Sequence, residues 1–182
     1  FGLGDSLLIA AGVGNTPWTV LAEGIADTTE VWTIGEATFL VSVAVMFLWI
    51  PIKETPGIGT ILNIIIIALT IHVMVPILPQ PENPLVSILM ASLGIVLVGI
   101  GSCMYLTANL GPGPRDGWMT GLQRTTGIPI GRVRIAIESS VLVIGIVLGG
   151  TFGIGTILFA VTIGPVVASC LSIASRIDST TG

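Results

Sequence analysis

Glu138 and Arg134 are oppositely charged residues within an apolar stretch that covers residues 129–149. A charge at the centre of a membrane helix costs about 2.5–3.5 kcal/mol, so Glu138 is expected to face protein or water rather than lipid. Residues four apart share one face of a helix, and Arg134 is therefore expected to pair with Glu138. A permanent pair makes Glu138 structural, whereas a pair that opens lets Glu138 relay a proton or bind a cation. Both interpretations stay open.

Further polar side chains lie in apolar stretches. Asp5 and His72 can titrate in a proton pathway, although a hydrogen-bonded packing role is favoured for His72. Asn63, Thr107 and Asn109 either line the interior or bond neighbouring helices.

Two segments rich in Gly and Pro interrupt the apolar pattern. Residues 12–17 read Gly-Val-Gly-Asn-Thr-Pro and residues 109–114 read Asn-Leu-Gly-Pro-Gly-Pro, each opening a short helix. Pro in the first turn is typical of a helix start, and the free N–H groups there attract anions. Arg115 strengthens this attraction in the second segment, where Trp18 stands in the first. The alternative is a pair of tight turns with Trp18 and Trp118 as interfacial anchors.

These observations define a candidate pathway for a solute or an ion. Its members are Asp5, Asn15, Asn63, Asn109, Arg115, Asp116, Arg134 and Glu138.

No catalytic set accompanies these residues. The chain has one His and two Cys, with no metal-ligand spacing, no nucleophile elbow and no phosphate loop. The sequence therefore predicts no enzyme, no metal site and no cofactor. Cys103 and Cys170 are expected to act as small hydrophobic residues rather than as a disulfide or metal pair.

The composition is that of a membrane protein. Hydrophobic residues make up 52% of the chain and charged residues 9%, whereas soluble domains carry about 25% charged residues. Six Lys and Arg in total also exclude the basic surface that nucleic-acid binding requires. A lipid bilayer is the expected surrounding.

Six hydrophobic stretches predict six transmembrane helices. They cover residues 1–13, 34–52, 57–79, 84–110, 129–149 and 153–175. The first is shorter than the about 20 residues that a span requires, so the chain is expected to begin inside its first helix. Residues 17–29 and 114–126 are too short and too polar to span, and are expected to form interfacial or re-entrant half-helices.

The charges predict an orientation. Counting alternate loops, Lys and Arg fall on one side of the membrane and Glu23, Asp27, Glu30, Glu36 and Glu82 on the other. The positive-inside rule places the basic side, and with it the C-terminus, in the cytoplasm.

The two halves of the chain repeat each other. Residues 57–62 and residues 153–158 both read Gly-Ile-Gly-Thr-Ile-Leu, and Gly14 and Pro17 recur as Gly111 and Pro114. The offset is 97 residues up to residue 29 and 96 residues from residue 34 on, and we call positions related in this way equivalent. Two three-span units, residues 1–80 and 84–176, must enter the membrane in opposite senses, as in many secondary transporters. Channels and proteins unrelated to transport also contain inverted repeats. The symmetry breaks at Glu138, whose equivalent is Ser42.

The repeated glycines have two interpretations. Gly57, Gly59, Gly153 and Gly155 are expected to let helices approach closely where the two repeats meet. Lining a substrate path is the less favoured alternative.

The chain resembles a known family over essentially its whole length. Gly-Pro-Gly-Pro-Arg-Asp-Gly-Trp-Met at residues 111–119, Thr16-Pro17-Trp18 and the repeated Gly-Ile-Gly-Thr are similar to bacterial YczE-type membrane proteins, relatives of the YitT group. The chain departs from the family at its front end, where the amino-terminal part of the first span is missing. The resemblance implies a protein of the bacterial inner membrane and carries over no catalytic residues.

The favoured function is a small secondary transporter or exporter of an organic solute, with its site at the interface of the two repeats. The alternative is a scaffold or regulatory partner of another membrane complex that transports nothing. A homodimer is compatible with the sequence but not indicated by it.

Overall fold

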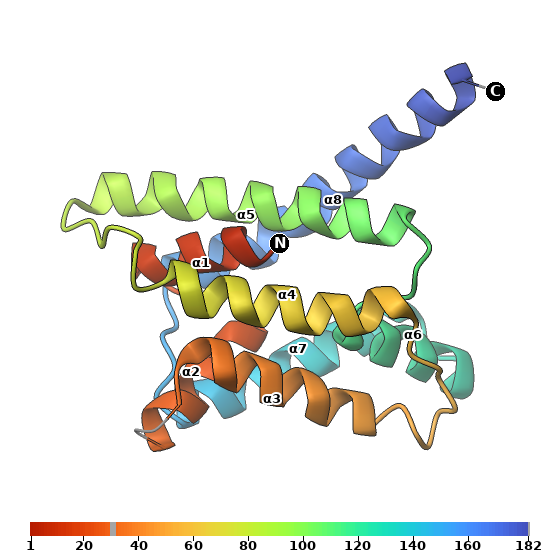
Figure 1. Cartoon of the computed structure of the whole chain (residues 1–182), viewed down its shortest axis with the longest axis horizontal. Helices are drawn as coiled ribbons and strands as arrows, with labels where there is room; N and C mark the ends of the chain where they lie inside the picture. Colours follow the sequence, from red (N-terminus) through yellow and green to blue (C-terminus); the bar gives the residue numbers. More distant parts are fainter. Residues whose placement is uncertain (30–31, 182) are drawn as a thin grey trace.

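The structure is a computed structural model that describes residues 1–29 and 32–181, with side chains up to residue 174. Every regular element in this part of the chain is an α-helix, which confirms the predicted all-helical class (Figure 1). The helices are α1 (Gly2–Ala11), α2 (Pro17–Thr29), α3 (Ile34–Phe47), α4 (Ile58–Met74), α5 (Pro84–Thr107), α6 (Pro114–Thr126), α7 (Ile130–Val147) and α8 (Ile154–Thr181).

Local sequence signals set several helix ends. Thr33 and Glu36 form a capping box at the start of α3, which satisfies backbone N–H groups that have no partner within the helix. Pro114 occupies the first turn of α6, where its missing N–H costs nothing. The predicted short helices at 17–29 and 114–126 have these bounds in the structure.

Two predicted spans are shorter as helices than as apolar stretches. The stretch 34–52 forms a helix only to Phe47, about 21 Å at 1.5 Å per residue, and continues as turns. Trp49 lies in these turns, and its indole N–H donates to the carbonyl of Pro114 at 2.9 Å. The stretch 57–79 ends as a helix at Met74, two residues before Pro76, which cannot continue a helix.

Within the described residues, two helices are long and apolar enough to cross a membrane. They are α5 and the part of α8 from Ile154 to Ala174, and the sharply bent pair of α2 and α3 makes a third if it is counted as one span. Helices α1 and α4 are apolar but shorter, and α7 carries Arg132, Arg134 and Glu138.

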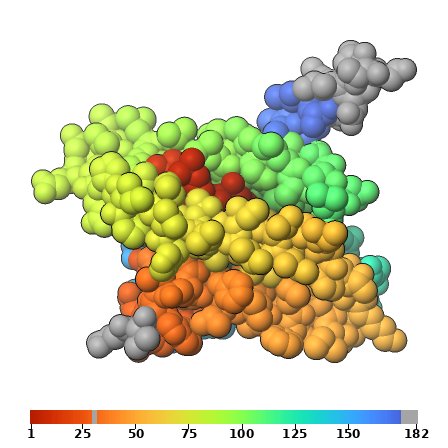
Figure 2. All heavy atoms as spheres, in the orientation of Figure 1, coloured from red at the N-terminus to blue at the C-terminus, as the bar shows by residue number. Residues whose placement is uncertain are grey.

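Helix α1 lies at the centre of the bundle. It packs against α4 and α5, and α5 also packs against α8. Side chains of α1, α5 and α8 share one hydrophobic core cluster. Figure 2 shows only small patches of α1 between α4 and α5. An added Cβ at Gly4 would lie 2.5 Å from the carbonyl oxygen of Gly94, so the absence of a side chain lets the two backbones touch.

The outer surface is largely apolar. Large hydrophobic side chains are exposed on helices of both halves, among them Ile58, Leu69, Ile135, Val147 and Val161. A surface of this kind fits contact with lipid, where apolar side chains are stable.

The helices of the two halves match in their bounds but not in their packing. Helix α6 begins and ends 97 residues after α2, and α7 and α8 begin 96 residues after α3 and α4. Helix α3 packs along α4, whereas α7 does not pack along α8 in the described part of the chain (Figure 1).

Candidate functional site

A cavity of about 80 Å³ lies where both Gly/Pro segments meet helices α5, α7 and α8. Such a volume holds a few water molecules or a small ion. It is lined by Phe1, Thr16, Pro17, Trp18, Val98, Ser102, Tyr105, Leu106, Arg115, Asp116, Met119, Arg134, Glu138, Phe159, Ile163 and Val167.

Arg115 is a cation without an ionic partner in this cavity. Its guanidinium carbon lies 5.2 Å from the centre of the Trp18 ring, a cation–π geometry. Trp18 in turn meets the edge of Trp118, with ring centroids 6.5 Å apart. The ion pairs formed by the described residues do not include Arg115. The tryptophan face therefore supports the guanidinium while its N–H groups remain available.

Arg134 and Glu138 form the ion pair that their spacing predicts. Arg134 Nε donates to Glu138 Oε1 at 2.9 Å, and both side chains keep partial exposure. Both residues line the wall of the cavity.

Asp116 has a different partner from its neighbour Arg115. The Tyr105 hydroxyl of α5 donates a hydrogen bond to Asp116 Oδ2. This bond ties α6 to α5 at the edge of the cavity and occupies one carboxylate oxygen.

Asp5 is completely buried, and neither carboxylate oxygen has a hydrogen-bond partner among the described residues. It lies within electrostatic range of Arg115 and close to Thr19. A buried carboxylate without hydrogen bonds is costly, so Asp5 is a strong candidate for a functional rather than a structural group.

A second cavity of about 30 Å³ adjoins the first, since Phe1, Tyr105, Arg115 and Asp116 line both. Asn63 of α4 and Ser42 of α3 complete its polar lining. The structure thus brings Asp5, Asn63, Arg115, Asp116, Arg134 and Glu138 into one region.

Asn109 and Asn15 lie apart from this group. Asn109 is exposed in the turn after α5, where it adopts a left-handed conformation with φ of 52°, and does not line either cavity. Asn15 is buried, and its Nδ2 donates to Glu23 Oε2 at 2.9 Å. Its Oδ1 has no partner in the described part of the chain.

Glu23 joins the two halves, although the sequence singles it out only as a charge on one side. Besides Asn15, it accepts from the Thr151 backbone N–H and the Thr151 hydroxyl, both at 2.8 Å. Glu23 and Thr151 are 128 positions apart in the sequence, so no local pattern indicates this contact.

The repeated glycines lie against the opposite half. Gly59 N–H donates to the carbonyl of Leu110 at 2.9 Å, and its equivalent Gly155 donates to Val13 at 2.8 Å. An added Cβ at Gly57 or Gly153 would also lie within 2.5 Å of the same carbonyl oxygens. The start of α4 therefore docks on the second Gly/Pro segment, and the start of α8 docks on the first.

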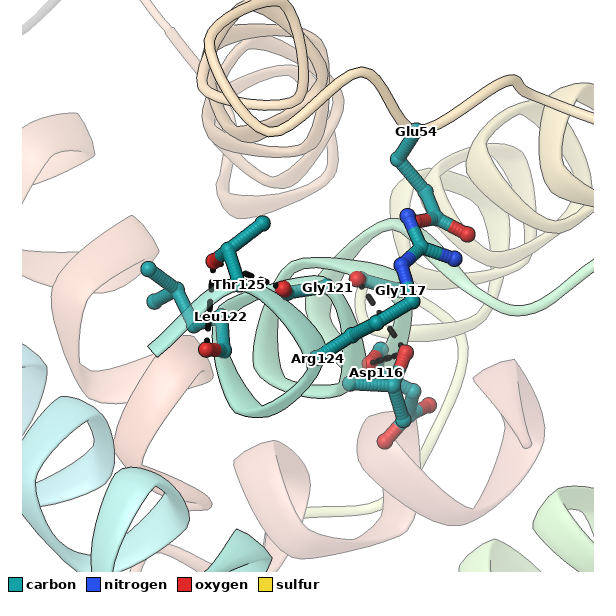
Figure 3. A network of polar contacts seen from close by, with 8 residues as sticks. Glu54, Asp116, Gly117, Gly121, Leu122, Arg124 and Thr125 are labelled. Atoms are coloured by element: carbon teal, nitrogen blue, oxygen red, sulfur yellow. Dashed lines mark hydrogen bonds and ion pairs between the residues drawn. The ribbon is translucent and has the colours of Figure 1, made fainter. Parts of the chain in front are cut away.

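A second ion pair lies at the outer edge of α6. Arg124 pairs with Glu54 of the connection between α3 and α4, and Thr125 bonds back to Gly121 (Figure 3). Neither Arg124 nor Glu54 lines the central cavity, so this network fastens α6 rather than forming the site.

An apolar groove of about 480 Å³ lies on the outer surface between α3 and α4. Exposed Phe39, Leu40 and Ile65 line it, which fits lipid contact. No group of three His, Cys, Asp or Glu residues suited to a metal occurs in the described part of the chain, and both cysteines are free thiols.

Apolar outer faces around an enclosed charged cavity define an all-helical membrane protein. A family model described as "Family of unknown function (DUF6198)" matches residues 1–172, and the chain belongs to this family. The resemblance to YczE-type membrane proteins is confirmed by the relatives.

Three relatives cover most of the chain. An "Uncharacterized protein" of Haemophilus influenzae is 46% identical over 176 residues, which span 97% of this chain and 80% of the relative. The "Uncharacterized membrane protein YczE" of Bacillus subtilis is 33% identical over 156 residues, 84% of this chain and 71% of the relative. The "Uncharacterized protein YyaS" of Bacillus subtilis is 28% identical over 169 residues, 86% of this chain and 79% of the relative. No solved structure matches the chain.

Proposed function

We propose that the protein is a small secondary transporter or exporter of an organic solute in the bacterial inner membrane. Helices α1, α3, α4, α5, α7 and α8 are its six spans, α2 and α6 are half-helices, and the halves form an inverted repeat with a cytoplasmic C-terminus. The solute site lies in the central cavity, between the halves.

One observation carries this proposal: the two adjoining cavities are lined by residues at equivalent positions of the two halves. The larger cavity is lined by residues of the first Gly/Pro segment and of α7 and α8, and the smaller by residues of the second segment and of α3 and α4. Five pairs of equivalent positions have one member that lines only the larger cavity and one that lines only the smaller: Thr16 and Gly113, Pro17 and Pro114, Glu138 and Ser42, Phe159 and Asn63, Ile163 and Ile67. Trp18 lines the larger cavity, and its equivalent Arg115 lines both. A site on the axis of an inverted repeat suits alternate access from the two sides.

The charges in the cavity suggest how a solute is held. Arg115 forms no ion pair with a described residue, so we assign it to an acidic group of the solute. The start of α6 lies beside it and adds the positive end of the helix dipole. Glu138 and Asp5 are then the groups that carry a coupling proton or cation.

Ligand-dependent stability of the full-length protein in detergent tests this proposal. A solute at 100 times its Kd stabilises the fold by about 2.7 kcal/mol, a visible rise in Tm across a panel of metabolites and antibiotics. Arg115→Gln should abolish the rise. Arg132→Gln, at an exposed position outside the cavity, is the matched control and should keep it.

The small volume of the cavity favours a second candidate, a scaffold or regulatory partner that transports nothing. About 80 Å³ is well below the roughly 300–1,000 Å³ of typical ligand pockets, so an organic solute requires the cavity to widen. A folded sample that responds to no compound, but copurifies with one defined membrane protein, would replace the transport proposal with this one.

A further inference from the structure

The two halves differ where their second and third spans meet. Gly35 of α3 is seated on α4, since an added Cβ would lie 2.7 Å from the carbonyl oxygen of Ala68. Gly131 is its equivalent on α7, and no described atom lies within 4 Å of an added Cβ there. Gly164, the equivalent of Ala68 on α8, faces open space in the same way. One junction is closed and its counterpart is open.

A hydrogen bond fastens the closed junction. Thr33 Oγ1 and His72 Nδ1 lie 2.9 Å apart and join the start of α3 to the end of α4. Pro129, directly before the start of α7, and Ala168, the equivalent of His72, have no hydrogen-bonding side chains and are exposed. The hydrogen bond between Thr33 and His72 would therefore have no counterpart in a closed junction of α7 and α8.

The state of each junction matches the size of the cavity beside it. The larger cavity lies between Glu138 of α7 and Phe159 of α8, helices that do not pack along each other. The smaller cavity lies between Ser42 of α3 and Asn63 of α4, helices that do. Their volumes are about 80 and 30 Å³.

Gly131 and Gly164 have no role in the open junction that requires glycine. Glycine in a helix is about 1 kcal/mol less favourable than alanine, and neither residue has a close neighbour or a positive φ. Gly35 shows what glycine does at the equivalent place, where it admits the backbone of the facing helix. Pro165, inside α8 and next to Gly164, supplies a point of bending because it removes a helical hydrogen bond.

We propose that the protein exchanges this conformation for one in which α7 closes on α8 through Gly131 and Gly164, while α3 parts from α4 at Gly35 and Ala68. The larger cavity then shrinks and the smaller one opens at the opposite end of the bundle. The proposal rests on the proposed function, since this exchange is what alternate access to the central site requires.

Cysteine pairs at the two junctions test the exchange in membranes that contain the full chain, with Cys103 and Cys170 changed to Ala. Thr33→Cys with His72→Cys should form a disulfide readily, because these positions already touch. Pro129→Cys with Ala168→Cys should also form one within a single chain, because it traps the closed junction of α7 and α8. Each single variant controls for links between two copies, which appear at twice the mass.

Gly131→Leu makes the test decisive. It fills empty space in the present conformation, so the fold and the link between residues 33 and 72 should persist, whereas the link between 129 and 168 should fall several-fold. Ser140→Leu is the matched control, since position 140 lies nine residues on, on the opposite face of α7, and should leave both links unchanged.

Two results would overturn the exchange. The first is a 33–72 pair that forms its disulfide while the 129–168 pair does not. The second is a yield of the 129–168 disulfide that stays the same in the Gly131→Leu variant. The outcome is independent of solute binding. If the disulfides respond as expected but the protein binds no solute, the exchange is retained and the transport proposal is overturned. If the protein binds a solute but the disulfides do not respond as expected, only the transport proposal is retained.

Discussion

The guanidinium carbon of Arg115 lies 5.2 Å from the centre of the Trp18 ring, and these two residues occupy equivalent positions in the two halves. The contact brings the Gly/Pro segments together at the central cavity. A cation–π contact is worth about 0.5–2 kcal/mol and leaves the N–H groups of arginine free to bind. The two halves therefore contribute different side chains to the site, the cation Arg115 from the second half and the aromatic ring of Trp18 from the first.

Asp5→Asn is expected to raise the stability of the protein. The carboxylate of Asp5 is buried and has no hydrogen-bond partner among the described residues, and residues kept for function commonly cost stability. Removing the charge should raise Tm in detergent without added solute. The same change at Asp116 should lower stability by about 1 kcal/mol, because Asp116 accepts a hydrogen bond from Tyr105. A fall in Tm for Asp5→Asn would show that Asp5 is structural.

Glu138→Gln is expected to alter ligand response far more than stability. A helical ion pair with partial exposure contributes about 0.3–0.5 kcal/mol, and the Arg134–Glu138 pair is of this kind. Thermal unfolding should change little, while the solute-dependent rise in Tm should disappear. Glu54→Gln breaks the pair with Arg124 outside the cavity and should keep the ligand response. A large loss of stability with the response intact would make Glu138 a structural residue.

Two Gly→Ala changes are expected to have opposite effects. An added Cβ at Gly117 would lie 2.2 Å from Trp49 Cζ2, and Trp49 is only 2% exposed. Gly117→Ala therefore forces the indole off its bond to Pro114 and should cost about 1–3 kcal/mol, the usual range for overpacking. Gly131→Ala meets no described atom and should stabilise by about 0.4–1 kcal/mol, because alanine restricts the unfolded chain. Chemical or thermal unfolding of both variants checks the pair.

Local signals predicted part of the fold and long-range contacts decided the rest. The starts of α2 and α6 follow from Pro17 and Pro114, because proline is favoured in the first turn of a helix. The predicted span 34–52 is helical only to Phe47. In the turns that follow, Trp49 donates to the carbonyl of Pro114, 65 positions away. Hydropathy measures apolar character and cannot tell a helix from an apolar turn.

In the candidate site, too, contacts within one helix could be predicted from the sequence and contacts between distant segments could not. Glu138 and Arg134 could be paired from their spacing alone, since one helix holds both. Asn109 was placed in the pathway as a polar residue at the end of an apolar stretch, but it lies in a left-handed turn with its side chain exposed. Glu23 could not be recognised as a link between the halves, because its partner Thr151 belongs to the connection between α7 and α8. The inverted repeat itself remains a prediction that rests on equivalent residues.

The proposed orientation makes a prediction that needs no ligand. Lys53 and Glu82 are exposed in the connections that follow α3 and α4, and the six-span arrangement places them on opposite sides of the membrane. In a chain with Cys103 and Cys170 changed to Ala, Glu82→Cys should react in intact cells with a thiol reagent that cannot cross the inner membrane. Lys53→Cys should react only after the membrane is opened, because the positive-inside rule holds its loop in the cytoplasm. Reaction of both positions from the same side would mean that α4 does not span, and would rule out the inverted arrangement together with the central site that depends on it.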